Sequence, residues 1–262
     1  MKNEIILKSF IKKFWYAPAD AFLRAAEATI WKEIKLESPI LDIGCGDGSI
    51  SKLLFQQRKI DIGLDSNPEV VKKSRSCGIY RKLVVADAAK MPFKNNSFQT
   101  IISNSTFEHI KKDISALAEA ARVLKNNGRL LITVPLKRFQ DTIRQIINNP
   151  KEVAKFNQRL NHLHYYNINE WGKILNSQGL KIDSLQYYFP PQLVKVWHRL
   201  FKIATFKLHQ RELWSYLQIS IIKSMIPSRL VVFILEKYLL KYFKYILDAE
   251  GCFVLITAYK IK

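Results

Sequence analysis

The fold of this chain is decided by the stretch LDIGCGDGS at residues 41–49. The apolar residues 39–41 lead into it and the helix-like run 50–54 follows, so the pattern predicts a strand, a glycine-rich turn and a helix. Glycines let the backbone turn tightly and approach a ligand closely, because they carry no Cβ. The start of a helix behind such a turn offers unpaired N–H groups to a ligand. We therefore expect a ligand site at this strand end, with Asp42 placed to meet a positive group.

The spacing of the glycines distinguishes between kinds of glycine-rich turn. A dinucleotide site requires G-x-G-x-x-G, and a phosphate-binding loop requires G-x-x-x-x-G-K-[ST]. Here glycines stand at positions 44, 46 and 48, and no Lys-Ser or Lys-Thr pair follows them. Asp42 and Asp47 would also repel a pyrophosphate. The spacing therefore argues against both a dinucleotide site and a phosphate-binding loop.

The motif D-I-G-C-G-D-G resembles the first motif of class I S-adenosylmethionine-dependent methyltransferases, of the small-molecule kind called methyltransferase type 11. Later segments match the same family in order over residues 38–189, and residues 252–260 match its last strand. The resemblance implies an α/β, Rossmann-like, doubly wound fold with a mostly parallel seven-stranded sheet. It also implies that the protein is an enzyme with S-adenosyl-L-methionine as its cofactor.

Acidic residues follow two further predicted strands. The strand at 60–65 ends in Asp65, about twenty residues after the turn, where a carboxylate can reach ribose hydroxyls. A loop or helix-capping carboxylate is the other interpretation of Asp65. The strand at 82–87 ends in Asp87, at the ligand edge of such a sheet. The cofactor-binding residues implied by the resemblance are Asp42, Gly44, Cys45, Gly46, Asp65, Ser66, Asp87, Ala88 and Asn104.

The loop after the strand at 100–103 reads NSTFEHI, and in the family it lies nearest the transferred methyl group. His109 is the candidate catalytic base there, because the pKa of histidine lies near neutrality. In the other interpretation, Glu108 and His109 only start or cap the next helix, which we expect at 114–124 with Gly128 as its C-cap. In similar methyltransferases, an N/D-P-P-Y/F motif or a Pro-Cys pair in this loop accompanies methylation of nucleic-acid bases. This loop has neither, which argues against nucleic acid as acceptor.

Residues 136–167 are expected to be polar and irregular, with a short helix at about 139–148. They end in NHLHYY, where two histidines at i and i+2 lack a third metal ligand nearby in the sequence. Cys45, Cys77 and Cys252 have unrelated spacings, so neither a disulfide framework nor a zinc site is predicted. We expect no metal site. By resemblance, His164 and Tyr165 are predicted to line the substrate side of the pocket.

The chain is predicted to have four parts: N-terminal helices at 1–37, a core at 38–189, an inserted helical subdomain at 190–250 and the last core strand at 251–262. Residues 1–16 read as a basic amphipathic helix that either lies in a membrane interface or packs as a lid over the cofactor. Its apolar stripe consists of Ile6, Leu7, Phe10, Ile11 and Phe14. A second helix is expected at 19–36.

The insert is basic and aromatic. It contains ten Lys or Arg against four Asp or Glu, a net charge of 10 − 4 = +6. Three interpretations follow: a membrane-binding cap over a lipid pocket, a plain cap or dimer interface, and an RNA-binding appendage. The continuously apolar run 230–235 favours the membrane over RNA. The oligomeric state is not predicted.

The net charge of +20 implies an anionic partner. No run of about 18 uncharged apolar residues is present, and the basic N-terminus lacks a signal-peptide cleavage site. We expect a cytoplasmic protein, with a peripheral position on the inner face of the membrane as a further expectation. The predicted acceptor is a hydrophobic or membrane-associated small molecule, such as a quinone precursor, a lipid or a lipid-linked sugar. The alternatives are a soluble metabolite, an RNA, or a cofactor-binding partner protein without catalysis.

Overall fold

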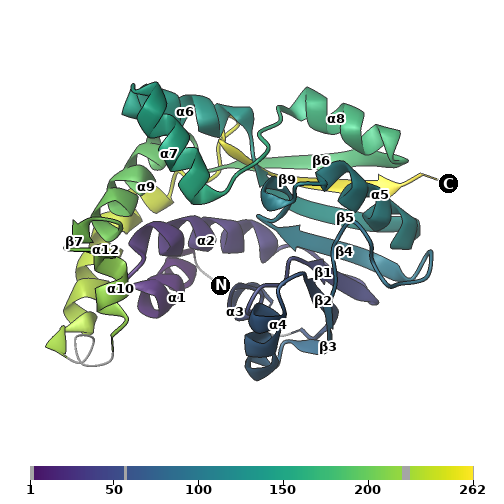
Figure 1. Cartoon of the computed structure of the whole chain (residues 1–262), viewed down its shortest axis with the longest axis horizontal. Helices are drawn as coiled ribbons and strands as arrows, with labels where there is room; N and C mark the ends of the chain where they lie inside the picture. Colours follow the sequence, from purple (N-terminus) through teal and green to yellow (C-terminus); the bar gives the residue numbers. More distant parts are fainter. Residues whose placement is uncertain (1–2, 56–57, 220–224, 262) are drawn as a thin grey trace. The chain divides into compact units, whose positions relative to one another are not determined.

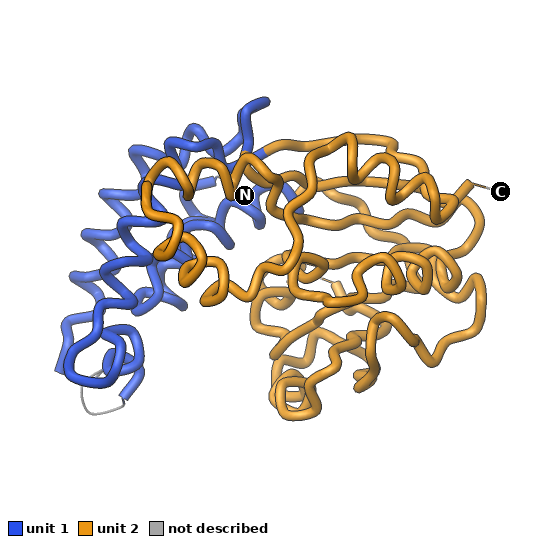
Figure 2. The backbone as a smooth tube through the Cα atoms, turned by 45° about the horizontal axis from the view of Figure 1, so that its top comes forward, with its two compact units in different colours: residues 1–31, 188–251 blue, residues 32–187, 252–262 orange. Residues whose placement is uncertain are grey.

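The computed structural model describes residues 3–55, 58–219 and 225–261 (Figure 1). The first two residues of the predicted N-terminal helix and residues 220–224 of the predicted insert lie outside this described part. The chain forms two compact units (Figure 2). One combines residues 1–31 with 188–251, and the other combines residues 32–187 with 252–262.

The second unit is built on a seven-stranded sheet with the order β3-β2-β1-β4-β5-β9-β6. The first five strands of this order pair in parallel, and β9 is antiparallel to β5. The strands are β1 (Ile40–Ile43), β2 (Ile60–Asp65), β3 (Tyr80–Val85), β4 (Phe98–Asn104), β5 (Leu124–Pro135), β6 (Leu180–Tyr188) and β9 (Phe253–Lys260). The predicted fold class is confirmed. The strand order reverses between β1 and β4, and open sheets of this kind bind ligands beyond the carboxyl ends of the strands at that point.

Local capping signals set the helix starts in this unit. Asn67 precedes α4, and its side chain accepts hydrogen bonds from Glu69 N and Val70 N. Asn167 forms a capping box with Glu170 at the start of α8. The helices are α3 (Ser49–Leu54), α4 (Pro68–Ser74), η1 (Arg75–Cys77), η2 (Phe107–His109), α5 (Asp113–Val123), α6 (Lys137–Ile147), α7 (Pro150–Leu160) and α8 (Ile168–Ser177).

Two local predictions are wrong. The expected irregular segment contains a second helix, α7, which begins after Asn149 with a proline in its first turn, a recognisable start signal. Gly128 does not cap α5, because β5 begins directly after Val123 and includes Gly128. A Cβ at Gly128 would lie 2.8 Å from the Lys125 carbonyl oxygen and 3.0 Å from that of Gln99. Close backbone packing therefore requires this glycine.

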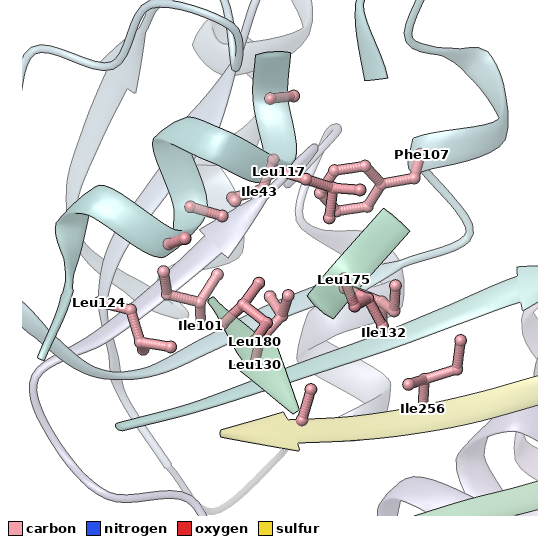
Figure 3. Packing of buried hydrophobic residues seen from close by; sticks show 14 of the residues in the cluster. Ile43, Ile101, Phe107, Leu117, Leu124, Leu130, Ile132, Leu175, Leu180 and Ile256 are labelled. Carbon is pink, nitrogen blue, oxygen red and sulfur yellow. The ribbon is translucent and has the colours of Figure 1, made fainter. Parts of the chain in front are cut away.

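The core of this unit lies between the sheet and the helices α5 and α8 (Figure 3). Ile101 and Ile132 from the sheet, Leu117 from α5 and Leu175 from α8 are all fully buried in one cluster. Burial of each such side chain contributes about 1.5–3 kcal/mol to folding. The cluster fixes the strand ends and hence the loops that follow them.

The other unit joins the N-terminal helices to the insert, which the sequence analysis treated as separate parts. It contains α1 (Asn3–Phe14), α2 (Pro18–Trp31), α9 (Pro191–Ala204), the hairpin β7 (Lys207–Leu208) and β8 (Arg211–Glu212), α10 (Leu213–Leu217) and α12 (Ser228–Phe243). Helix α1 packs on α2 and α12. Phe22 of α2 contacts the rings of Phe189 and Phe243, at centroid distances of 5.2 and 6.3 Å.

The predicted amphipathic helix is present as α1, but its apolar stripe does not face solvent. Ile6, Leu7, Phe10 and Ile11 are each at most 2% exposed. The interpretation that this stripe lies in a membrane interface is therefore wrong for this structure, because the stripe belongs to a packed core. None of the described helices is long and apolar enough to cross a bilayer.

Candidate cofactor and acceptor site

A cavity of about 520 Å³ lies where β1, β2, β3 and β4 end. Its volume is within the usual range for small-molecule sites. Its walls consist of Ile43, Gly44, Leu64, Asp65, Ser66, Ala86, Asp87, Ala88, Ser105, Thr106, His109, Ile110 and Lys111. Of the predicted site residues, Gly44, Asp65, Ser66, Asp87, Ala88 and His109 are in this wall. Asp42, Cys45, Gly46, Asn104, His164 and Tyr165 are not, and their predicted roles stay predictions.

Asp65 connects the end of β2 to the glycine turn. Its Oδ2 accepts a hydrogen bond from Gly46 N at 3.0 Å, and its Oδ1 accepts from Asn67 N at 3.0 Å. A carboxylate offers about four lone-pair positions, so two further hydrogen bonds can be accepted on the cavity side. The fixed carboxylate therefore suits two vicinal hydroxyls of a ribose.

The N–H groups of the glycine turn are used within the protein. Gly44 N and Cys45 N both donate to Leu64 O, at 2.8 and 3.0 Å, and Gly48 N donates to Cys45 O at 3.1 Å. Gly44 has φ +74°, and a Cβ there would lie 2.2 Å from Thr106 Cγ2. The turn therefore packs tightly between β2 and the loop after β4, and it shapes the cavity wall.

Asp42 is buried beneath the turn. Its Oδ2 accepts hydrogen bonds from Tyr80 OH at 2.6 Å and Ser51 Oγ at 2.8 Å. Burial raises the pKa of Asp42 to about 6, although these two hydrogen bonds oppose the rise. In this structure, its carboxylate ties β1 to α3 and β3.

Cys45 is also buried. Burial, together with the nearby Asp42 and Asp65, raises the pKa of its thiol. The thiol therefore stays protonated at neutral pH, which makes it a poor nucleophile.

Asp87 and Ala88 follow β3, and both line the cavity. Asp87 is exposed, and its Oδ1 accepts from Ala89 N at 2.8 Å. Ala88 is buried and presents an apolar surface beside this carboxylate. An acceptor group beside an apolar surface fits an aromatic ring with an amino group.

The loop after β4 contributes wall residues that the sequence analysis did not single out: Ser105, Thr106, Ile110 and Lys111. Ser105 has φ +48° and its N donates to Thr133 O at 3.0 Å, which bends the loop over the strand ends. Asn104 instead accepts from Thr133 Oγ1 at 2.9 Å. The signal that could have found these residues was their position directly after a central strand.

Glu108 and His109 form the short helix η2 and do not cap α5, which begins only at Asp113. Glu108 is 3% exposed. His109 Nδ1 lies 2.9 Å from Asn161 O. A carbonyl only accepts, so Nδ1 carries the proton and Nε2 carries the lone pair in the neutral ring.

His164 and Tyr165 have partners within the protein. His164 Nε2 lies 3.0 Å from Ile110 O and 3.7 Å from Asp113 Oδ1. Tyr165 OH donates to Asn157 Oδ1 at 3.3 Å. Both side chains hold the 161–166 segment in place.

Comparison with known proteins finds a methyltransferase match in part of the chain. Residues 41–132 match the family model described as a methyltransferase domain. This match covers part of the chain, and it confirms the resemblance to methyltransferases and the S-adenosylmethionine cofactor that the glycine turn predicted. The fixed Asp65 carboxylate and the Asp87–Ala88 pair fit the nucleoside part of that cofactor.

Curated relatives resemble this chain over part of their length. An uncharacterized protein of Methanocaldococcus jannaschii is 38% identical over 43% of this chain and 43% of its own length. The ubiquinone/menaquinone biosynthesis C-methyltransferase UbiE of Citrifermentans bemidjiense is 32% identical over 39% of this chain and 49% of its own length. The chain thus spans about half the length of these relatives.

Solved structures share the fold over most of the chain. A methyltransferase of Thermotoga maritima, titled a possible histamine N-methyltransferase, has a TM-score of 0.58 at 18% identity and covers 97% of this chain and 99% of its own. Geranyl diphosphate C-methyltransferase of Streptomyces coelicolor has a TM-score of 0.55 at 14% identity, covering 90% and 77%. At these identities the likeness concerns the fold.

Proposed function

We propose that the protein transfers a methyl group from S-adenosylmethionine to a hydrophobic or membrane-associated small molecule. The observation that carries methyl transfer is one cavity lined by Asp65, Asp87 and residues of the loop 105–111, in a chain whose residues 41–132 match a methyltransferase domain. When bound, S-adenosylmethionine supplies a methyl group on a positively charged sulfur. Because this group is already activated, the protein mainly has to position the acceptor and remove its proton.

The residues divide this work between two parts of the cavity. Asp65 and Asp87 hold the nucleoside, each with a carboxylate that is already oriented by a backbone N–H group. His109 is the candidate base, because its Nδ1 is engaged by Asn161 O and its Nε2 can accept a proton. Lys111 brings a positive charge to the same wall.

The proposal of a hydrophobic or membrane-associated acceptor rests on helix α12. Leu230, Phe233 and Ile234 are 54%, 56% and 56% exposed. Lys237 and Lys241 follow at helical spacing and are exposed as well. Lys237 Nζ lies 5.8 Å from the Phe233 ring centroid.

An exposed apolar group beside lysines on one helix face suits an anionic lipid surface, where rings enter the interface and ammonium groups meet headgroups. Two similar proteins, UbiE and geranyl diphosphate C-methyltransferase, have names that refer to quinone biosynthesis and to a prenyl diphosphate. Their names support, for this chain, an acceptor that carries an apolar chain.

The test is co-sedimentation of the full chain with phosphatidylcholine vesicles of graded phosphatidylglycerol content. The double variant Phe233→Ser/Ile234→Ser removes two of the three exposed apolar side chains and leaves the buried residues of α12 unchanged. Ile114→Ser, at a 41% exposed position of α5, is the matched control. We expect binding to rise with anionic lipid and to weaken about 10-fold or more in the double variant alone.

Failure of the wild-type chain to sediment at every lipid content would contradict the membrane part of the proposal. Formation of S-adenosylhomocysteine is then measured with prenylated phenols, soluble amines and RNA as acceptors. Product from a soluble metabolite or RNA alone would overturn the hydrophobic acceptor. Cofactor binding without product from any of them would favour a non-catalytic protein.

A further inference from the structure

The tertiary structure brings three metal-ligating side chains together beside the cavity. Glu108, His109 and His162 each offer one ligand atom, and these atoms all lie within 4.8 Å of one another. The sequence predicted no metal site, because His162 and His164 have no third ligand nearby in the sequence. The fold instead places His162 against a pair more than fifty positions earlier.

Three hydrogen bonds join the segment 161–164, which contains His162, to the segment 108–110. Leu163 N donates to Glu108 O at 2.7 Å, His109 Nδ1 donates to Asn161 O at 2.9 Å, and His164 Nε2 lies 3.0 Å from Ile110 O. The backbone segments that carry the three side chains are therefore joined, and the His109 ring is held, before any ligand arrives. A preorganised site does not have to order its residues upon binding.

Both histidines have a hydrogen-bond partner at Nδ1. His109 donates its Nδ1 proton to a carbonyl, which leaves Nε2 with the lone pair. His162 Nδ1 lies 2.9 Å from Tyr165 OH, whose own proton goes to Asn157 Oδ1. This hydroxyl can therefore accept from His162 Nδ1, in the tautomer of His162 whose Nε2 carries the lone pair. Metal-binding histidines usually have such a partner on the other ring nitrogen.

The charge at this place favours a cation. Glu108 is 3% exposed, and a buried carboxylate is costly unless positive charge accompanies it. A divalent ion held by this carboxylate and the two imidazoles would bring positive charge to it.

We propose that Glu108, His109 and His162 bind a divalent metal ion such as Zn²⁺. Two imidazoles and one carboxylate match the three protein ligands of catalytic zinc sites, which keep a fourth position open. Metal–ligand distances of about 2.0–2.2 Å require the ligand atoms to close slightly around the ion.

His109 also lines the cavity, so the ion would lie at the cavity wall. Its open position can take water or an oxygen atom of the acceptor, and a bound hydroxyl has a lowered pKa. In that case His109 serves as a ligand, and the ion promotes proton loss from the acceptor to solvent. This role rests on the proposed function, whereas metal binding itself does not.

The experiment measures binding of Zn²⁺ and of Co²⁺ to the full chain by calorimetry and by the visible absorption of Co²⁺. Glu108→Gln and His162→Asn remove one ligand each. His209→Asn is the matched control, because His209 is exposed and lies more than forty residues after His162 in the sequence. Its φ of 55° is a conformation that asparagine accepts. We expect one ion per wild-type chain, unchanged binding in the control, and at least about 10-fold weaker binding in the other two variants.

Thiolate-to-cobalt charge-transfer absorption would overturn the proposal. Binding by Glu108→Gln and His162→Asn as tight as that of the wild-type chain would also overturn it. A measurement on the wild-type chain alone covers the case in which these variants do not fold. Paramagnetic Co²⁺ should broaden the ring resonances of His109 and His162 and leave those of His209 sharp, and the reverse pattern contradicts the site. Calorimetry with S-adenosylmethionine on the same samples tests the proposed function separately.

Discussion

The carboxylate of Asp65 accepts a hydrogen bond from the backbone N–H of Gly46 at 3.0 Å. The acid at the end of β2 therefore holds the glycine turn at the end of β1. One residue thus shapes the cavity and offers its remaining lone pairs to a ligand. Two sequence signals about twenty residues apart meet in this one contact.

Asp65→Ala should weaken S-adenosylmethionine binding by about 10- to 100-fold, because hydrogen bonds to a charged group contribute about 1.5–3 kcal/mol. Calorimetry measures the affinity. Asp183→Ala, at an exposed position of β6, is the control. Unchanged affinity in Asp65→Ala would remove Asp65 from the cofactor site.

Gly44→Ala should destabilise the fold more than Gly46→Ala. Both positions have positive φ, which costs an alanine about 1–2 kcal/mol. Only at Gly44 does the new Cβ overlap Thr106, at 2.2 Å, whereas Gly46 has open space. We expect a difference of about 1–3 kcal/mol in the free energy of unfolding measured with urea. Equal losses of unfolding free energy in the two variants would show that the Thr106 side chain moves away at little cost.

Asp42→Asn should change how stability depends on pH. The pKa of Asp42 is raised from 3.8 to about 6 in the folded protein, so folding favours its protonated form. Its stabilising contribution is full below pH 3.8 and is lost as the pH rises through about 6.

The uncharged variant should lose less stability than the wild type between pH 4 and pH 7.5, by an amount on the order of 3 kcal/mol. Urea unfolding of both proteins at the two pH values gives this difference directly. Parallel pH profiles would mean that Asp42 has an ordinary pKa in the folded protein.

His109→Ala should lower turnover by about 100-fold or more and leave the affinity for S-adenosylmethionine nearly unchanged, because the proposed role of His109 concerns the acceptor. Formation of S-adenosylhomocysteine with the acceptor found in the screen measures turnover. His209→Asn serves again as the control. Full turnover in His109→Ala would assign His109 only to the hydrogen bond with Asn161 O.

The sequence alone determined the parts of the fold whose signals are local. The glycine turn, the strands that alternate with helices and the acids at positions 65 and 87 predicted both the sheet and the place of the cavity, because strand ends in such a sheet share one edge. Asn67 and Pro68 likewise mark the start of α4 without any knowledge of the fold. These features depend on residues close together in the chain.

Only the tertiary structure decided which distant side chains meet. It buries Asp42 against Tyr80 and Ser51, joins the N-terminal helices to α9 and α12 in one unit, and sets His162 beside Glu108 and His109. Spacing in the sequence does not encode these contacts, because they arise from the packing of whole elements and from the backbone hydrogen bonds that place one loop on another. The cavity was therefore predictable from local pattern, whereas the chemistry at its wall depended on packing.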